Sequence, residues 1–369
     1  MTKMAIDGII KDWGERLHYS PVRGSKGKNI RSGGKTTPAR PEPKPSGPAT
    51  YEKVARTAKK TPEVMVKISG GGKNMQHIKA HMDYLSRNGE VELEDENGDI
   101  HDGKEAVRDV RDAWAKGKIG IPYDGEKRKE AFNIILSMPP GTDRQAVKDA
   151  ARAFAKEQFG NHQYIFATHE DEKHPHVHLS VKAVDHDGVR MNPRKGDLQF
   201  WREQFAEKLR EQGIEANATP RKARGIVQKA EKQAVKHINK DFEEGKRKAP
   251  ARVTQAQKLD AEQEAKTGKK RTNPAQDNIR AARKDAHNAY GQIARAFATG
   301  EAEDKRIALE IVKFVQTMPP TTTRHESLVQ NLQKTGAKSA GRDQERETSK
   351  TPENAVEQGR AKSDDEQTR

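Results

Sequence analysis

The chain has 369 residues, of which 32% are hydrophobic and 34% are charged, and its formal net charge is +15. This composition is too polar for one fully packed globule, and the positive charge favours a polyanionic partner, above all nucleic acid. The absence of cysteine excludes disulfides and cysteine-based zinc sites. No apolar run is long enough to span a membrane, and the N-terminus lacks a secretory core, so we expect a cytoplasmic protein.

Residues 1–61 are predicted to form a basic N-terminal extension. A short helix is expected over residues 1–16, followed by SPVRGSKGKNIRSGGKTTPARPEPKPSGP, which is rich in Gly, Pro, Ser and basic residues. Such a composition is typical of a flexible arm. A second helix is expected near Tyr51, ending before Pro62.

The first half of the compact domain predicted over residues 62–230 begins with a strand, EVMVKIS, in which apolar and polar residues alternate. The segment NMQHIKAHMDYLSR follows as a helix with Asn74 as its N-cap. Its two stripes are expected to be apolar (Met75, Ile78, Met82, Leu85) and polar (His77, His81, Tyr84). A hairpin through ENGD and a helix over GKEAVRDVRDAWAKG come next.

The second half opens on AFNIILSMP, an apolar run that predicts a buried strand. The helix TDRQAVKDAARAFAKEQFG follows, with Thr142 and Gln145 at capping-box spacing. HQYIFATHE and PHVHLSVKAVD read as paired strands, and DLQFWREQFAEKLREQG reads as an amphipathic helix. The interleaving of strands and helices predicts an α/β two-layer sandwich, with a largely antiparallel central sheet flanked by helices.

The rest of the chain is predicted to divide into a charged helical region, residues 231–318, and a disordered tail, residues 319–369. One segment, DKRIALEIVKFVQTM, carries an apolar helical stripe at Ile307, Ile311, Val312 and Val315. This stripe either docks onto a partner protein or caps the compact domain, and the sequence leaves both readings open.

Four of the thirteen histidines lie in THEDEKHPHVHLSVK, at His169, His174, His176 and His178. On a strand, His176 and His178 share one face, while the intervening valine and leucine face the core. His169 lies across the loop, so three imidazoles are expected to hold a divalent metal with open positions. His174 and the loop residue Glu172 are expected to lie around the ligands.

Three blocks of sequence together resemble the conjugative relaxases, or mobilisation nucleases, of the P class that includes the T-DNA border endonucleases. They are VMVKISGGGKNMQHIKAHMDYLSRNGEVELE, LSMPPGTD and HEDEKHPHVHLSV, in this order. The resemblance covers about residues 62–230. It implies an enzyme that nicks one DNA strand at an origin of transfer through a tyrosine that stays joined to the 5′ end.

By this resemblance, Tyr84 is the catalytic tyrosine, and His169, His176 and His178 hold the metal, with Mg²⁺ or Mn²⁺ expected. Asp171 corresponds to the acidic residue of the motif and is expected to help activate the tyrosine. A tyrosine hydroxyl has an ordinary pKa of about 10 and needs such help near neutral pH. Candidate contacts to DNA are Lys67, Lys73, Arg87 and Lys182.

The implied partners are single-stranded DNA at the origin of transfer, accessory DNA-binding proteins of the relaxosome and a type IV coupling protein. The implied location is the bacterial cytoplasm, with export alongside the DNA into a recipient cell. Two other functions stay open. A rolling-circle replication initiator would use similar chemistry, although such initiators usually place the tyrosine after the histidines. A non-catalytic DNA-binding mobilisation accessory protein would carry the histidines as a fossil metal site that supports no cleavage.

Overall fold

The computed structural model describes residues 3–18, 47–117, 119–125, 127–228 and 230–335. Contacts group the chain into two compact units. Unit 1 comprises residues 1–224 and 284–318, and unit 2 comprises residues 225–283 and 319–369. The basic arm predicted after residue 18 lies outside the described residues up to residue 46.

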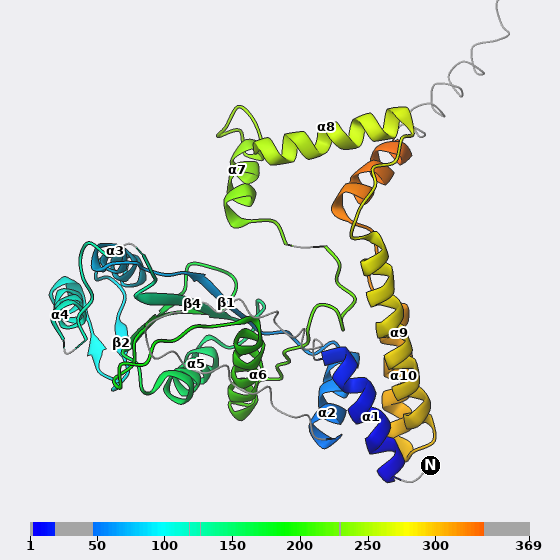
Figure 1. Cartoon of the computed structure of the whole chain (residues 1–369), viewed down its shortest axis with the longest axis horizontal. Coiled ribbons are helices and arrows are strands. Elements are labelled where there is room, and N and C mark those ends of the chain that lie inside the picture. The colour runs from blue at the N-terminus through cyan, green and yellow to red at the C-terminus, as the bar shows by residue number, and fades with distance from the viewer. Residues whose placement is uncertain (1–2, 19–46, 118, 126, 229, 336–369) are drawn as a thin grey trace, which may run out of the picture. The chain divides into compact units, whose positions relative to one another are not determined.

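Unit 1 contains a six-stranded sheet (Figure 1), with the strand order β1-β4-β6-β5-β2-β3 and antiparallel pairing throughout. Its strands are β1 (Met65–Gly70), β2 (Leu93–Asp95), β3 (Ile100–His101), β4 (Ala131–Ser137), β5 (Tyr164–His169) and β6 (His176–Lys182). Helices flank this sheet, so the predicted α/β sandwich with a largely antiparallel sheet is confirmed.

One face of the sheet is closed by α5 (Arg144–Phe159) and α6 (Lys195–Glu211). Strand β6 contributes Val177, Leu179 and Val181 to this core, as the alternation in the sequence predicted. These residues pack with aromatic side chains of both helices, including Phe154 and Phe205. We call this the covered face.

The opposite face carries α3 (Met75–Leu85) and α4 (Gly103–Lys116), whose apolar stripes bury part of β4 and β5. The predicted α3 stripe is confirmed, because Met75, Ile78, Met82 and Leu85 are all buried. Toward β1 this face is less covered, and Met65 on that edge strand remains 42% exposed. We call this the open face.

The N-cap of α5 differs from the prediction. Asp143, and not Thr142, accepts the backbone hydrogen bond from Ala146 at 2.6 Å. Thr142 instead donates its hydroxyl to the carbonyl of Pro139, and Gln145 turns to Asp149. A carboxylate is a stronger acceptor at the positive end of a helix than a hydroxyl, which accounts for the shift by one residue.

A second core in unit 1 is formed by four helices: α1 (Lys3–His18), α2 (Gly47–Ala58), the later part of α9 (Gln276–Ala298), and α10 (Ala302–Gln316). The predicted boundaries lie at residues 61, 230 and 318. The compact unit that contains the sheet instead includes the N-terminal helices and residues 284–318. A buried network ties α2 to the residues after α6, because Thr57 hydrogen-bonds Thr219 at 2.9 Å and Asn217 at 3.1 Å.

The predicted stripe on α10 is partly wrong. Ile307 and Ile311 are buried, but Val312 is 45% exposed and Phe314 takes its place in the core. The stripe therefore packs within the chain, in the four-helix core with α1, α2 and α9 and not in the core of the sheet domain, which differs from both predicted alternatives. Val315 packs against this core as predicted, and only Val312 was misplaced, because Phe314, three residues after Ile311, lies on the buried side of the helix.

Unit 2 contains α7 (Gln233–Glu243), α8 (Arg252–Thr267) and the first part of α9. Residues 324–335 are also helical, which corrects the prediction of disorder from residue 319 onward. Thr323 and Glu326 form reciprocal capping bonds at the start of this helix, and Val329 is buried. Residues 336–369 lie outside the described residues. None of the described helices is long and apolar enough to span a bilayer.

Candidate active site

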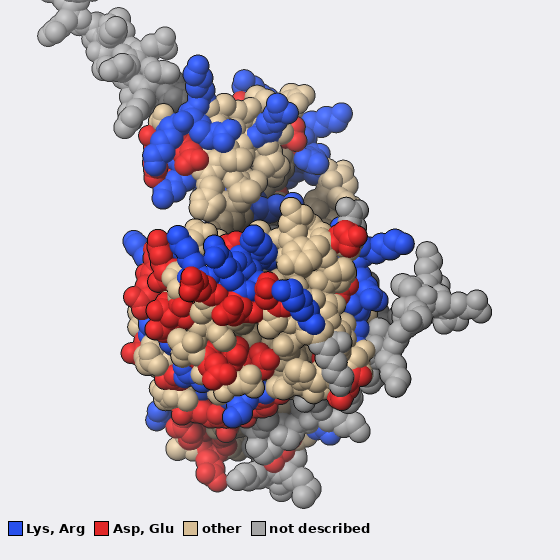
Figure 2. Space-filling view, turned by 90° about the vertical axis from the view of Figure 1, so that its left-hand side faces the viewer, with Lys and Arg blue, Asp and Glu red and all other residues tan. Residues whose placement is uncertain are grey.

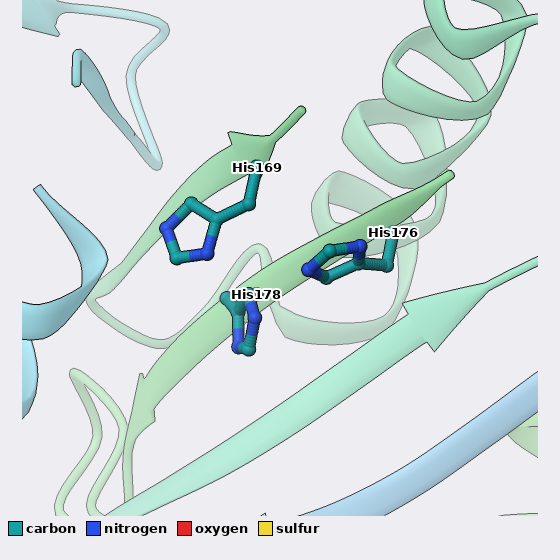
Figure 3. A group of neighbouring side chains, drawn as sticks. All are labelled: His169, His176 and His178. Carbon is teal, nitrogen blue, oxygen red and sulfur yellow. The ribbon is translucent and has the colours of Figure 1, made fainter. Parts of the chain in front are cut away.

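Three histidine side chains converge on the open face (Figure 3). His169 and His176 are directly opposite one another across the β5–β6 pair, and His178 lies two residues further along β6. Their ring centroids are 4.6 to 5.8 Å apart. One nitrogen of each ring lies within 4.8 Å of the others, so the group can hold a metal ion. The structure thus brings together the three predicted ligands.

Burial keeps two of these imidazoles, those of His169 and His178, in the neutral form that metal coordination requires. It lowers the pKa of His178 to about 3, assisted by the neighbouring histidines and by Arg87. Burial also lowers the pKa of His169, and the nearby Arg87 and His176 add to the effect. Neither ring therefore needs to lose a proton to a metal at neutral pH.

Backbone carbonyls fix the tautomers of two of the rings. Nε2 of His169 donates to the carbonyl of Leu85 at 2.9 Å, and Nδ1 of His176 donates to the carbonyl of His174 at 2.9 Å. A carbonyl can only accept, so each contacting nitrogen carries the proton. The free lone pairs are then Nδ1 of His169 and Nε2 of His176. Such outer hydrogen bonds orient metal-binding imidazoles, and the donor set therefore fits a divalent ion.

Tyr84 lies at the end of α3 beside this triad. Its ring meets those of His169 and His178 edge-on, with both centroid distances 5.5 Å, and stacks on His81 at 5.9 Å. His81 is one turn earlier on the same helical face, and burial lowers its pKa to about 4. The Tyr84 side chain is 46% exposed, so it stands next to the histidines and is open to solvent.

Asp171 is paired with an arginine. Its Oδ2 accepts a hydrogen bond from Nη2 of Arg87 at 2.5 Å, and the same Nη2 lies 3.2 Å from Nδ1 of His169. The Arg87 guanidinium also lies over the Tyr84 ring, 4.9 Å from its centroid. Asp171 therefore reaches the tyrosine and the triad by way of Arg87.

Arg144 is a neighbour of the site that the sequence reasoning missed. It is the first residue of α5, and its guanidinium donates to the carbonyls of His169 at 3.4 Å and Glu172 at 2.5 Å. It thereby clamps the loop that carries Asp171 between β5 and β6. Its position directly after the block LSMPPGTD was the available signal.

The remaining candidates are scattered. The His174 and Glu172 side chains are exposed, and only their carbonyls make the contacts described above. Lys67 is half-buried on β1, on the open face, and Lys73 is exposed before α3. Lys182 is 3% exposed and donates to Gln163, so it is unsuited to bind a DNA backbone. The sequence reasoning missed this because strand alternation does not reveal which end of a strand is covered.

Comparisons of the sequence with known proteins match the part of the chain that carries the triad. Residues 84–214 match the family model described as "Relaxase: MobA/VirD2-like, nuclease domain". This segment begins at Tyr84 and includes the three histidines, and it is similar to the nuclease domain of MobA/VirD2-like relaxases. The predicted family resemblance is thereby confirmed for this part of the chain.

Individual curated proteins are also similar to this chain. The chain is 31% identical over 187 residues to the T-DNA border endonuclease VirD2 of Rhizobium radiobacter. It is 30% identical over 186 residues to the protein of the same name from Agrobacterium fabrum (strain C58 / ATCC 33970). The matches cover 45% of this chain and 44% and 42% of the two relatives. The chain thus matches less than half the length of each.

Proposed function

We propose that the chain is a site- and strand-specific DNA relaxase that nicks an origin of transfer through Tyr84. The observation that carries this proposal is the contact of one solvent-open tyrosine with two histidines of a metal-competent triad. A phosphodiester transferase needs a nucleophile and a cationic centre at the same phosphate. The match to a relaxase nuclease domain supports the same function.

In the proposed reaction, the Tyr84 hydroxyl oxygen forms a bond to phosphorus and loses its proton. The bond from phosphorus to the 3′ oxygen breaks, and that oxygen takes up a proton to leave as a free hydroxyl. The 5′ end remains joined to Tyr84 as a phosphotyrosyl ester. Because one phosphodiester replaces another, the reverse attack by a 3′ hydroxyl reseals the strand without a nucleotide cofactor.

His169, His176 and His178 would hold Mg²⁺ or Mn²⁺, which would offset negative charge on the reacting phosphate. The chain's own residues position the tyrosine. His81 stacks on its ring, the two triad histidines meet it edge-on, and Arg87 lies over it. Asp171 contributes by holding Arg87 and takes no proton directly from Tyr84.

The DNA strand is proposed to follow the open face. Lys67 and Lys73 supply positive charge there, and Arg87 supplies a planar donor pair for phosphate. Figure 2 shows that basic and acidic side chains lie side by side on this face of the molecule, so the proposed path rests on the placement of Lys67, Lys73 and Arg87.

We propose that the partners of the chain are single-stranded DNA at the origin, accessory relaxosome proteins and a type IV coupling protein. We also place the reaction in the bacterial cytoplasm, with export of the joined strand. A replication initiator remains the alternative enzyme, and a non-catalytic mobilisation protein the alternative binder. Capturing covalent adducts from cells and sequencing the attached 5′ ends separates an origin of transfer from a replication origin.

The decisive experiment uses Tyr84→Phe, which removes only the hydroxyl. Incubation with single-stranded origin DNA and Mn²⁺ should yield a covalent adduct with the unaltered protein and none with the variant, while DNA binding persists. Tyr123→Phe is the matched control, because Tyr123 is 59% exposed and lies outside the triad. An adduct that survives in Tyr84→Phe and disappears in Tyr123→Phe would overturn the assignment, and no adduct in any protein would favour the non-catalytic alternative.

A further inference from the structure

The backbone that carries Arg87 has an unusual conformation. Arg87, Asn88 and Gly89 follow α3 with φ angles of 50°, 59° and 91°. Gly89 adopts positive φ readily and Asn88 tolerates it, but an arginine rarely does. Left-handed backbone at a non-glycine residue persists where the surroundings hold it in place, and such positions gather at functional sites. Arg87 is therefore directed by the fold toward its partners.

Those partners include the one free lone pair of His169. Nε2 of this ring is committed to the Leu85 carbonyl, so Nδ1 is the acceptor that faces Nη2 of Arg87 at 3.2 Å. A guanidinium has only donors and never loses its charge in a protein. A divalent ion bound by His169 would need the same lone pair, and two cations cannot share it.

We propose that Arg87 competes with the metal ion for Nδ1 of His169, and that a DNA phosphate relieves this competition by drawing Arg87 away. This inference rests on the metal centre of the proposed function and adds a coupling to it. An arginine released from His169 keeps one partner, Asp171, at the rim of the site. Both Asp171 and a phosphate are anions, so the guanidinium moves between favourable acceptors.

The consequence is positive cooperativity between metal and DNA. If a phosphate removes a competitor from a metal ligand, DNA raises the metal affinity, and the metal raises the DNA affinity by the same factor. The ion would then bind tightly only when a strand is present. A strand and an ion would be brought to Tyr84 together, which limits reaction with an incomplete site.

The test measures Mn²⁺ affinity by calorimetry in the full chain with Tyr84→Phe, so that no DNA is cleaved. Titrations run with and without saturating oligothymidylate, and the same protein with His178→Ala defines binding outside the triad. The added variant is Arg87→Asn, because asparagine tolerates positive φ. It should raise the Mn²⁺ affinity without DNA about tenfold, as expected for losing a competing charged hydrogen bond. It should also diminish the gain caused by DNA.

Arg108→Gln is the matched control, since Arg108 is exposed on α4 and its loss changes the net charge equally. It should leave the Mn²⁺ affinity and its response to DNA unaltered. Unchanged or weaker Mn²⁺ binding in Arg87→Asn overturns the inference, and an equal gain in Arg108→Gln reduces it to general electrostatics and overturns it too. A parent protein that binds no Mn²⁺ through the triad would instead contradict the proposed metal centre.

Asp171→Asn provides an independent arm. In the protein that retains Arg87, this substitution should weaken Mn²⁺ binding, because the arginine loses its other partner and stays on His169. In the Arg87→Asn background it should have little effect, since the carboxylate acts through the arginine. An equal loss of Mn²⁺ affinity in both backgrounds would indicate that Asp171 binds the metal itself, and it would overturn the proposed competition between Arg87 and the metal.

Discussion

The two faces of the central sheet use the same strands for different purposes. On β6, Val177, Leu179 and Val181 enter the core beneath α5 and α6, while His176 and His178 lie on the face that is only partly covered. The core of the covered face is built from aliphatic and aromatic side chains, and the open face carries the triad. Stability and chemistry are thus separated by a single residue step along a strand.

The largest expected effect is the loss of chemistry on the open face. His178→Ala should lower the rate of nicking at least about 100-fold, because the triad loses one of its three ligands. Its thermal midpoint should change little, since no apolar core contact is removed. Rates of oligonucleotide cleavage measure the activity, and a melting curve measures the thermal midpoint. A His178→Ala variant that nicks at a normal rate would show that the reaction does not require the triad.

Leu179→Ala, the adjacent substitution, should have the opposite profile. Leu179 is buried in the covered face, and removing its side chain should cost about 2–5 kcal/mol of the free energy of unfolding. The protein that remains folded at low temperature should nick at a nearly normal rate. Denaturant unfolding gives the loss of stability. Equal damage to activity and stability by both substitutions would contradict the separation of the faces.

Regular alternation explains why the sheet and the triad could be predicted from sequence. His176 and His178 had to share a side of β6 if Val177 and Leu179 were buried, and the cross-strand position of His169 followed from a hairpin-like pair. The α3 stripe was equally readable, because Met75, Ile78, Met82 and Leu85 repeat at helical spacing.

Contacts that depend on tertiary neighbours could not be predicted in this way. The burial of Lys182 depends on how neighbouring segments cover the end of β6, and the placing of Phe314 depends on which side of α10 meets α2 and α9. Arg144 acts through carbonyls of a loop distant in sequence. The pairing of Arg87 with Asp171 joins residues 84 positions apart.

The comparison of buried and exposed positions extends to α10. Ile311 is 1% exposed in the four-helix core, whereas Leu309 on the same helix is 63% exposed. We expect Ile311→Ala to cost about 2–4 kcal/mol of unfolding free energy, and Leu309→Ala less than about 0.5 kcal/mol. Urea unfolding compares them. Similar losses would mean that α10 is covered by a partner, and no loss in either would mean that its core contributes little.

A smaller effect should appear as pH dependence that arises from the open face. Burial lowers the pKa of His178 to about 3 and that of His81 to about 4, from the ordinary 6.5. Between pH 6.5 and 4 the unfolded chain therefore binds protons that the folded chain does not, so the free energy of unfolding falls as pH falls. Urea midpoints at pH 7 and 5 should show this, with a weaker dependence in His81→Leu. Identical midpoints at both pH values would rule it out.

The smallest expected effect distinguishes two lysines of the sheet. Lys67 is half-buried on the open face, while Lys182 is buried and hydrogen-bonded to Gln163. If Lys67 contacts one phosphate, Lys67→Ala should make the slope of log affinity against log salt shallower by about 0.7, the value for one contact on a single strand. Lys182→Met should leave that slope unchanged, because the buried ammonium neutralises no phosphate. Fluorescence anisotropy with labelled single-stranded DNA at several salt concentrations measures both slopes. A shallower slope in Lys182→Met alone would contradict the proposed binding of DNA to the open face. Unchanged slopes in both variants would show that Lys67 contacts no phosphate.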